Sequence, residues 1–382
     1  MRRIYLDNAA TTAVSPAVME AMLPYFTQVY GNASSIHGFG REAKRAIENA
    51  RRQVVKALNA AAPQEIYFTA GGTESDNWAI KGVALAHQGG HIITTAIEHH
   101  AVLHTCQWLE KRGYDVTYLP VDEYGRVTAA QVEKALREDT ILVSVMAANN
   151  EVGTIQPIAE IGKLCRARGV LFHTDAVQAV GAIPIDVQAM NIDLLSLSAH
   201  KIHGPKGVGV LYVRKGVKID SLIHGGAQER GFRAGTENLP GIVGLGKAIE
   251  IACANLDDNA ARMTALRQRL IDGLRNRVSD TRLNGHPTER LPGNANLSFD
   301  KVEGEALLLR LDLMGVAGSS GSACTSGTLD PSHVLMALGL TQAQANGALR
   351  LTIGTDTTAE EIDAVLDILP PIVEDLRRMV SR

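Results

Sequence analysis

The chain has 382 residues, of which 45% are hydrophobic and 21% charged, and its formal net charge is −3. Because this length exceeds one ordinary hydrophobic core, the sequence predicts two domains. The near-neutral charge gives no basic surface for nucleic acid, no apolar run reaches membrane-spanning length, and the first residues lack an export signal. We therefore expect a cytoplasmic protein that contacts neither membrane nor nucleic acid directly.

Strand and helix patterns alternate between about residues 16 and 255. A one-sided apolar stripe predicts a helix over 37–58, and helical or glycine-rich stretches follow most of the strands. Near-continuous apolar strands separated by helices indicate a buried, mostly parallel sheet with helices on both faces. The predicted strands are 65–70, 91–96, 115–121, 140–148, 170–176, 193–199 and 207–213.

The pattern changes past residue 255, where a polar helix is followed by short strands and further helices. This part of the sequence favours a smaller α+β domain packed on the larger one. We predict a large domain over 16–255 and a small domain made of 1–15 and 256–382. The elements expected in the small domain are helices over 257–278, 302–315, 331–340 and 358–380 and strands near 282–285, 295–300 and 316–320.

The chain has four cysteines, none in a CxxC pair, so neither a zinc site nor a thioredoxin-like motif is indicated. Cys106 and Cys165 fall in probable helices and Cys253 follows an apolar run, which is typical of structural thiols. Cys324 differs, because it stands among small residues in SSGSACTSG. A thiol on such a flexible tether is either an idle surface group or one that has to move.

Three further stretches place polar groups where strands end. In AGGTESDN a strand runs into Gly71, Gly72 and Thr73 and then into a helix, whose free N–H groups form either a phosphate cup or a simple glycine turn. Asp175 is the last polar residue of the strand in FHTDAVQ, and its carboxylate either pairs with a cation or caps the next helix. Lys201 directly follows a strand in SLSAHKIHG, and it is either a reactive amine or an ordinary solvated side chain.

A phosphate cup, an acid and a lysine at the carboxyl ends of strands together describe a pyridoxal phosphate site. His99 follows the strand 91–96 and could stack on a ring or move protons. Arg350, in the apolar GALRLTIG, is either a carboxylate clamp or an ion pair between domains. His200 and His203 have an HxxH spacing without a third ligand, so we expect no resident metal.

Nine motifs occur in the order YLDNAATT, YGNASSIHGFG, AGGTESDN, IEHHAV, ANNEVGT, HTDAVQAVG, SLSAHKIHGPKGVG, HGGAQERGFRAGTEN and SSGSACTSG. With these motifs the sequence resembles, nearly end to end, the NifS/IscS-type cysteine desulfurases, which are class V aminotransferase-like enzymes of fold type I. The resemblance implies an α/β fold with a mostly parallel seven-stranded sheet, a homodimer, and pyridoxal phosphate as cofactor. It also implies a transferase that takes sulfur from L-cysteine and leaves L-alanine.

The resemblance further implies a role for each matching residue. Lys201 would carry the cofactor as an imine and move the substrate proton, His99 would stack on the ring and take the thiol proton, and Cys324 would be the nucleophile that receives sulfur as a persulfide. Asn32 and Arg350 would hold the substrate carboxylate. The remaining cofactor contacts would be Gly72, Thr73, Asn150, Asp175, Gln178, Ser198, His200 and, from the second subunit, Thr236.

The sulfur acceptor stays open at this stage. The loop continues as GTLDPSHVL, which resembles the nitrogenase-associated branch, and the chain stops at MVSR without the C-terminal extension of the housekeeping branch. We expect an iron–sulfur scaffold or another acceptor protein, in nitrogen fixation, general cluster assembly or tRNA thiolation, with Cys324 able to ligate a cluster transiently. Another pyridoxal phosphate activity, such as an aminotransferase or selenocysteine lyase, and a non-catalytic metal- or sulfur-carrying module are the alternatives.

Overall fold

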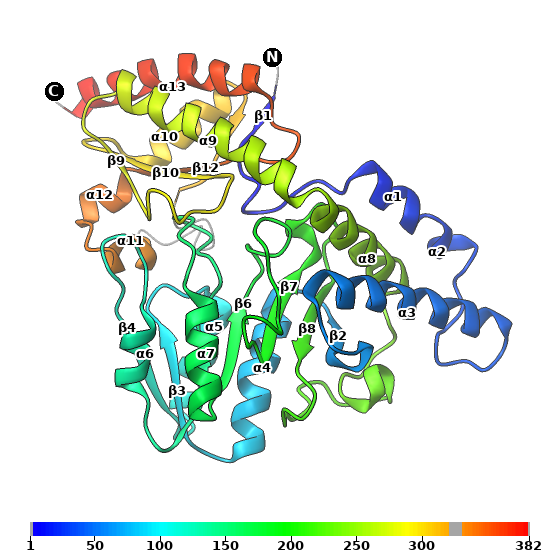
Figure 1. Ribbon diagram of the computed structural model, residues 1–382. Coiled ribbons are helices and arrows are strands. Elements are labelled where there is room, and N and C mark those ends of the chain that lie inside the picture. The colour runs from blue at the N-terminus through cyan, green and yellow to red at the C-terminus, as the bar shows by residue number, and fades with distance from the viewer. Residues whose placement is uncertain (1–2, 321–330, 381–382) are drawn as a thin grey trace.

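A seven-stranded sheet forms the centre of the larger lobe in the computed structural model, which describes residues 3–320 and 331–380 (Figure 1). Its strand order is β2-β8-β7-β6-β5-β3-β4, and only β8 runs antiparallel to its neighbours. This confirms the predicted mostly parallel sheet. The strands are β2 (Ile66–Thr69), β3 (His91–Thr95), β4 (Asp115–Leu119), β5 (Thr140–Ser144), β6 (Leu171–Asp175), β7 (Leu194–Ser198) and β8 (Gly209–Val213).

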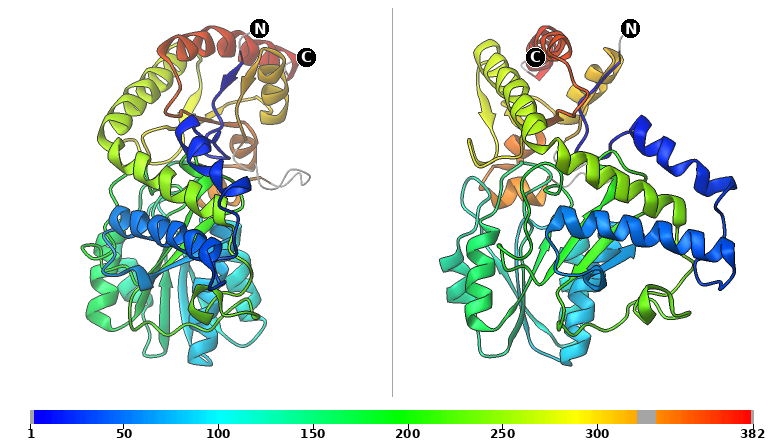
Figure 2. Two further views of the ribbon diagram at one scale, coloured as in Figure 1. Left: turned by 90° about the vertical axis from the view of Figure 1, so that its right-hand side faces the viewer. Right: turned by 45° about the vertical axis from the view of Figure 1, so that its right-hand side comes forward.

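Helices cover both faces of this sheet (Figure 2) because its strands are apolar on both sides. Along β2, Tyr67 packs with α4 and α5, whereas Ile66 and Phe68 point to the opposite face and pack with α3, α7 and α8. The helices of this lobe are α1 (Pro16–Met22), α2 (Pro24–Thr27), α3 (Gly38–Leu58), α4 (Gly72–His87), α5 (His100–Glu110), α6 (Ala129–Ala135), α7 (Ile158–Arg168) and α8 (Leu239–Ala254).

The smaller lobe holds the start and the end of the chain together (Figure 1). Its strands form a three-stranded antiparallel sheet, β12-β10-β9, and a parallel pair, β1 with β11. Ile4 and Leu6 share one hydrophobic core with α9, β10 and α13. The elements are β1 (Ile4–Tyr5), α9 (Leu256–Arg277), β9 (Thr281–Leu283), β10 (Asn294–Phe299), α10 (Gly304–Leu313), β11 (Val316–Ala317), α11 (His333–Ala337), α12 (Gln342–Asn346), β12 (Ala348–Thr352) and α13 (Ala359–Val380).

The predicted domain boundaries fall at two junctions of the fold, the start of α1 at Pro16 and the bend between α8 and α9 at Asn255. Within the described ranges no single helix is long and apolar enough to cross a membrane. Taken together, the bent pair of α8 and α9 has the length and apolar composition that a membrane span needs. The domain limits and the cytoplasmic location stay predictions.

The direction of β2 matters for the site. Because β8 is the one reversed strand, β2 runs parallel to the other five and ends at the same edge as β3, β5, β6 and β7. The loops that follow these five strands therefore meet at one edge, where ligands bind in open α/β sheets. Arg350 of β12 lines the same cavity as these loops, so the smaller lobe closes over that edge.

Candidate active site

A cavity of about 300 Å³ lies between this edge of the sheet and the smaller lobe. It brings together ten of the thirteen residues that the sequence singled out for chemistry. They are Gly72, Thr73, His99, Asn150, Asp175, Gln178, Ser198, His200, Lys201 and Arg350. Asn32 and Thr236 line a different cavity, and Cys324 lies outside the described residues.

The turn before α4 forms a tight cradle. Gly71 has φ of +152°, a conformation that side chains rarely adopt, and a Cβ on Gly72 would lie only 2.7 Å from Cγ2 of Val177. With no side chain on either glycine, the backbone N–H groups are bare at the start of a 16-residue helix, and the Ser198 side chain lies beside the turn. This geometry fits a phosphate group.

The amine of Lys201 is held against the N-terminal segment. Lys201 follows β7 in a short 3₁₀ helix, Ala199–Lys201, and its Nζ donates to the carbonyl oxygens of Ala9, at 2.5 Å, and Ala10, at 2.8 Å. Gln178 Nε2 also donates to the Ala9 carbonyl, at 3.0 Å. The lysine therefore faces the cavity in a fixed position that depends on residues nearly two hundred positions earlier.

Three buried carboxyl groups line the cavity: Asp175 at the end of β6, Asp76 on α4, and Glu151 directly after Asn150. Burial raises the pKa of Asp175 to about 6, while the Val177 N–H at 2.9 Å and the charge of Lys201 lower it. Burial and the nearby charge of Asp175 hold the pKa of Asp76 well above its usual range. The pKa of Asp175 stays below neutral pH, so its carboxylate is ionised there, whereas Asp76 holds its proton to a higher pH than an ordinary carboxyl group does. An ionised buried carboxylate fits a cationic ring nitrogen. Burial raises the pKa of Glu151 to about 7, while Ser332 and Arg350 lower it.

His99 is both a wall of the cavity and the N-cap of α5. Its Nδ1 accepts the N–H of Ala101 at 3.1 Å, which places the ring proton on Nε2 when the imidazole is neutral. Burial, followed by the charge of Lys201, lowers the pKa of His99 to about 4. The pKa of His200 falls to about 4 for the same two reasons. Both rings are therefore neutral beside Lys201 at neutral pH.

Arg350 is held in place by one partner from each lobe. Its Nη1 donates to the Asn150 carbonyl at 3.0 Å and its Nη2 pairs with Oδ1 of Asp7 at 2.9 Å. Its Nε is buried and has no hydrogen-bond partner among residues 3–320 and 331–380. Arg350 therefore makes an ion pair near the lobe boundary and keeps one donor in reserve for a carboxylate.

The described residues on both sides of the Cys324 segment are tied to the cavity. Ser319 exchanges backbone hydrogen bonds with Arg350, at 2.6 and 3.0 Å. Past the segment, Ser332 Oγ donates to Oε2 of Glu151, which lines the cavity, at 2.5 Å. His333 Nε2 donates to the Glu98 carbonyl at 3.0 Å.

Asn32 and Thr236 lie together in a separate cavity beside Glu237, whose Oε2 is buried and lacks a hydrogen-bond partner in the described part of the chain. Cys106 and Cys165 are buried thiols, as the sequence predicted. Burial raises the pKa of each to about 12. Across the described ranges, no three His, Cys, Asp or Glu side chains are grouped so that they could hold a metal ion.

The sequence assigned no role to four acidic residues of the site: Asp7, Asp76, Glu98 and Glu151. Asp7 and Asp76 stand inside the quoted motifs YLDNAATT and AGGTESDN, and Asp76 comes one helical turn after Gly72, so both could have been suspected. Glu151 follows Asn150 directly. Their partners come from distant parts of the chain, which local patterns do not reveal.

Comparison with known proteins shows the family of the chain. The family model of the class V aminotransferases matches residues 4–365 of this chain. The chain belongs to the class V aminotransferase family. It is 57% identical over 380 residues to the cysteine desulfurase IscS of Methanosarcina thermophila, an alignment that covers 99% of this chain and 94% of the relative.

Two solved structures share the fold. A NifS-like protein, 42% identical, superposes with a TM-score of 0.90 and covers 100% of both chains. A structure described as SspA in complex with cysteine, 39% identical, has a TM-score of 0.82 and covers 93% of this chain and 100% of the other. These likenesses confirm the predicted resemblance to the cysteine desulfurases and the α/β fold of the large lobe.

Proposed function

We propose that the protein is a pyridoxal phosphate-dependent cysteine desulfurase, which takes sulfur from L-cysteine, releases L-alanine and leaves a persulfide on Cys324. The observation that carries the proposal is the single cavity in which the Gly72 cradle, Asp175, Lys201 and Arg350 face one another. Each of these groups fits one part of the cofactor or substrate: phosphate, ring nitrogen, aldehyde carbon and carboxylate. The names of the relatives support the same substrate.

The cofactor would be held by residues at the ends of five strands. The start of α4 with Thr73, Ser198 and His200 would bind the phosphate, ionised Asp175 the ring nitrogen, and Lys201 the aldehyde carbon through Nζ. Asn150 and Gln178 would contact the ring hydroxyl, and His99 would stack on the ring. When bound, pyridoxal phosphate supplies an electron-accepting ring that stabilises negative charge on the Cα of an amino acid.

The substrate carboxylate would displace Asp7 from Arg350, whose unpartnered Nε adds a second donor and makes a bidentate clamp. Lys201, released from the cofactor, would take the Cα proton. Its anchors, the carbonyls of Ala9 and Ala10, accept but do not donate, so they hold the amine without supplying a competing proton.

Cys324 would then attack the substrate sulfur as a thiolate. An S–S bond forms, the C–S bond breaks, and the electron pair of the broken bond stays with the carbon that becomes alanine. Ser319 is hydrogen-bonded to Arg350 through the backbone. Cys324 comes five residues later, so the chain between them can span at most about 18 Å. Neutral His99 could take the thiol proton at Nε2 if its own proton moves to Nδ1, which gives up the bond to Ala101.

Two variants test the assignment. In Cys324→Ala, the yellow colour and its change on adding L-cysteine should survive, while alanine and sulfide release should collapse. Cys253→Ala, which removes a half-buried thiol, is the matched control and should turn over normally. Release of sulfur by Cys324→Ala at near the wild-type rate would contradict the nucleophile. A borohydride-reduced cofactor adduct on a lysine other than Lys201 would contradict the site itself.

A homodimer is part of the proposal. Segment 16–39 exposes a run of large apolar side chains, and it borders the cavity of Asn32 and Thr236. A second copy covering this surface would bring Thr236, and with it Asn32, to the partner's catalytic cavity. The exposed side chains are Met19, Leu23, Phe26, Tyr30, Ile36 and Phe39.

Subunit mixing tests this arrangement. Lys201→Ala and Thr236→Val should each have little activity as homodimers. If Thr236 acts across the interface, a hybrid of the two variants has one intact site and regains activity. If mixing restores nothing although light scattering shows a hybrid dimer, Thr236 acts within its own subunit. The acceptor, for which an iron–sulfur scaffold is the first choice, is tested by capture on the persulfide-loaded enzyme.

A further inference from the structure

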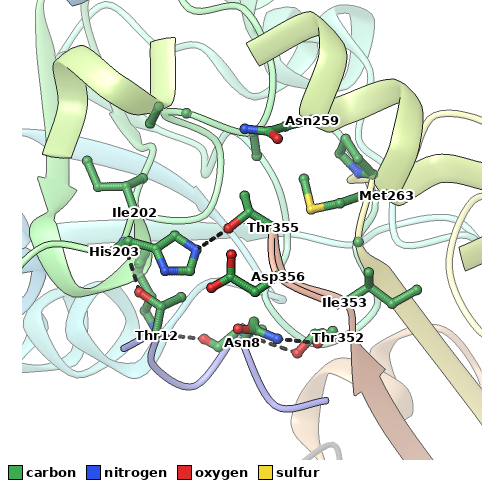
Figure 3. A pocket seen from close by; sticks show the side chains of 18 of the residues that line it. Asn8, Thr12, Ile202, His203, Asn259, Met263, Thr352, Ile353, Thr355 and Asp356 are labelled. Atoms are coloured by element: carbon green, nitrogen blue, oxygen red, sulfur yellow. Dashed lines mark hydrogen bonds between the residues drawn. The ribbon is translucent and has the colours of Figure 1, made fainter. Parts of the chain in front are cut away.

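A second cavity, of about 390 Å³, lies on the other side of the N-terminal segment, between the two lobes (Figure 3). It shares only Ala9, Gln178 and Lys201 with the catalytic cavity. One wall comes from α8 and the loop after Lys201, and the opposite wall comes from α9 and the loop after β12. Its volume falls within the range of small-molecule sites, about 300–1,000 Å³.

Most hydrogen-bond donors of this cavity are already occupied, and the Asn259 amide is one that makes no side-chain hydrogen bond within the described residues. His203 Nδ1 donates to the Ala13 carbonyl at 3.1 Å, and its Nε2 accepts from Thr355 Oγ1 at 2.9 Å. Asn8 Nδ2 donates to the Thr352 carbonyl at 2.8 Å. Lys201, the one cationic side chain in the lining, donates to the Ala9 and Ala10 carbonyls. A ligand would therefore find few donors on the protein side.

Acceptors, in contrast, remain available. Because Nδ2 of Asn8 and Nδ2 of Asn255 are both bonded to backbone carbonyls, their Oδ1 atoms are left to face a ligand. Asp356 points into the cavity beside Thr355 and Asn8 (Figure 3), and its carboxylate makes no hydrogen bond or ion pair within the described residues. The rest of the lining is apolar, with Ile202, Ile251, Ala252, Met263 and Ile353.

We propose that this cavity is a second ligand site that binds a small organic ammonium ion with an apolar body. The N–H donors and positive charge of such a ligand match the Asp356 carboxylate and the amide oxygens, and its hydrocarbon part covers the apolar wall. A carboxylic acid or phosphate is disfavoured, because no arginine lines the cavity and Lys201 is already engaged.

The position of the cavity couples it to substrate binding, a step that rests on the proposed desulfurase function. Asn8 lies between Asp7, which pairs with Arg350, and Ala9, which holds Lys201. A ligand that fixes Asn8 also holds Asp7 on Arg350, and Asp7 competes there with the substrate carboxylate. Occupancy should therefore raise the KM for L-cysteine.

The test uses the holoenzyme, isothermal calorimetry at neutral pH, and N,N-dimethylbutylamine as the probe. This tertiary ammonium ion cannot form an imine with the cofactor, and 1-hexanol is a neutral probe of the same size. We expect one amine per chain, with hexanol binding more weakly. Asp356→Asn should weaken the amine about fivefold, the effect of losing a partly exposed ion pair. Asp258→Asn, an exposed carboxylate nearby that does not line the cavity, should have no effect.

Ala252→Leu, which fills the cavity without changing charge, should abolish both amine binding and its effect on KM. Equal amine affinity in wild type and Asp356→Asn would overturn the proposed ligand class. Amine binding that survives Ala252→Leu would overturn the site. An amine that binds as expected but leaves KM unchanged would refute the coupling alone. Since calorimetry measures no turnover, failure of the site and failure of the desulfurase function are distinguishable.

Discussion

Glu98, the residue before His99, is fully buried and should keep its proton at neutral pH. Its Oε1 accepts from Thr95 Oγ1 at 2.8 Å and from the Met146 N–H at 3.0 Å, whereas Oε2 has no partner in the described residues. Burial raises the pKa of Glu98 to about 8, against the lowering effect of these two hydrogen bonds. Glu98→Gln copies the protonated form, because the amide oxygen can accept both bonds and the side chain cannot ionise.

The size of the effect follows from proton linkage. Between the ordinary carboxyl pKa of 4.5 and the folded value of about 8, the folded protein binds one more proton than the unfolded chain. The stabilisation from this proton is complete below the lower value and is lost as the pH rises through the higher one. The free energy of unfolding should therefore fall by about 1.4 kcal/mol per pH unit from this group. Between about pH 6 and pH 8 that amounts to about 2–3 kcal/mol.

Urea denaturation of the holoenzyme, followed by circular dichroism, measures this difference. The stability of Glu98→Gln relative to wild type should increase by about 2–3 kcal/mol between about pH 6 and pH 8. The exposed Glu123→Gln is the control and should track wild type at both pH values. A stability difference between Glu98→Gln and wild type that does not change with pH would mean that Glu98 is already ionised, and would refute the reasoning.

Two further substitutions test other parts of the site, and a third tests a buried ion pair outside it. Arg350→Lys should raise the KM for L-cysteine about 10- to 100-fold, because lysine cannot form the bidentate clamp; an unchanged KM would reject the clamp. Gly72→Ala should weaken cofactor binding, measured by absorbance titration, because its Cβ would meet Val177 at 2.7 Å; wild-type affinity would reject the cradle. Glu229→Gln breaks a buried bidentate ion pair with Arg51, in which both hydrogen bonds are 2.9 Å long. The free energy of unfolding, measured by urea titration, should fall by about 3 kcal/mol. A loss below about 1 kcal/mol would show that the pair behaves as an exposed one.

The sheet and the groups at the ends of its strands could be predicted from the sequence. Runs of apolar residues predicted the strands, and the end of each strand predicted where Thr73, His99, Asp175 and Lys201 lie. Arg350 was also singled out, with its two possible roles left open. The structure shows why neither could be chosen from sequence, since Arg350 is ion-paired yet keeps an unused donor.

The rest of the site depends on contacts that no local pattern encodes. The Arg350–Asp7 pair joins residues 343 positions apart, and the bonds from Lys201 to Ala9 and Ala10 span nearly two hundred. The raised pKa of Asp76 follows from its burial next to Asp175, which only the folded chain creates. The second cavity is likewise a property of how the two lobes meet. Sequence patterns describe strands and helices one at a time, so they could not have revealed it.

The N-terminal segment Asp7–Ala10 explains why these distant parts act as one site. Asp7 holds the guanidinium of Arg350, Ala9 and Ala10 hold the amine of Lys201, and Asn8 is bonded to the same strand as Arg350 through Thr352. In the proposed function, substrate binding at Arg350 and cofactor attachment at Lys201 would both require hydrogen bonds to this one segment to break. Any movement of the segment, from either cavity, therefore alters both groups together. The segment directly follows β1 of the smaller lobe, so the lobe that carries Arg350 also positions the amine of Lys201.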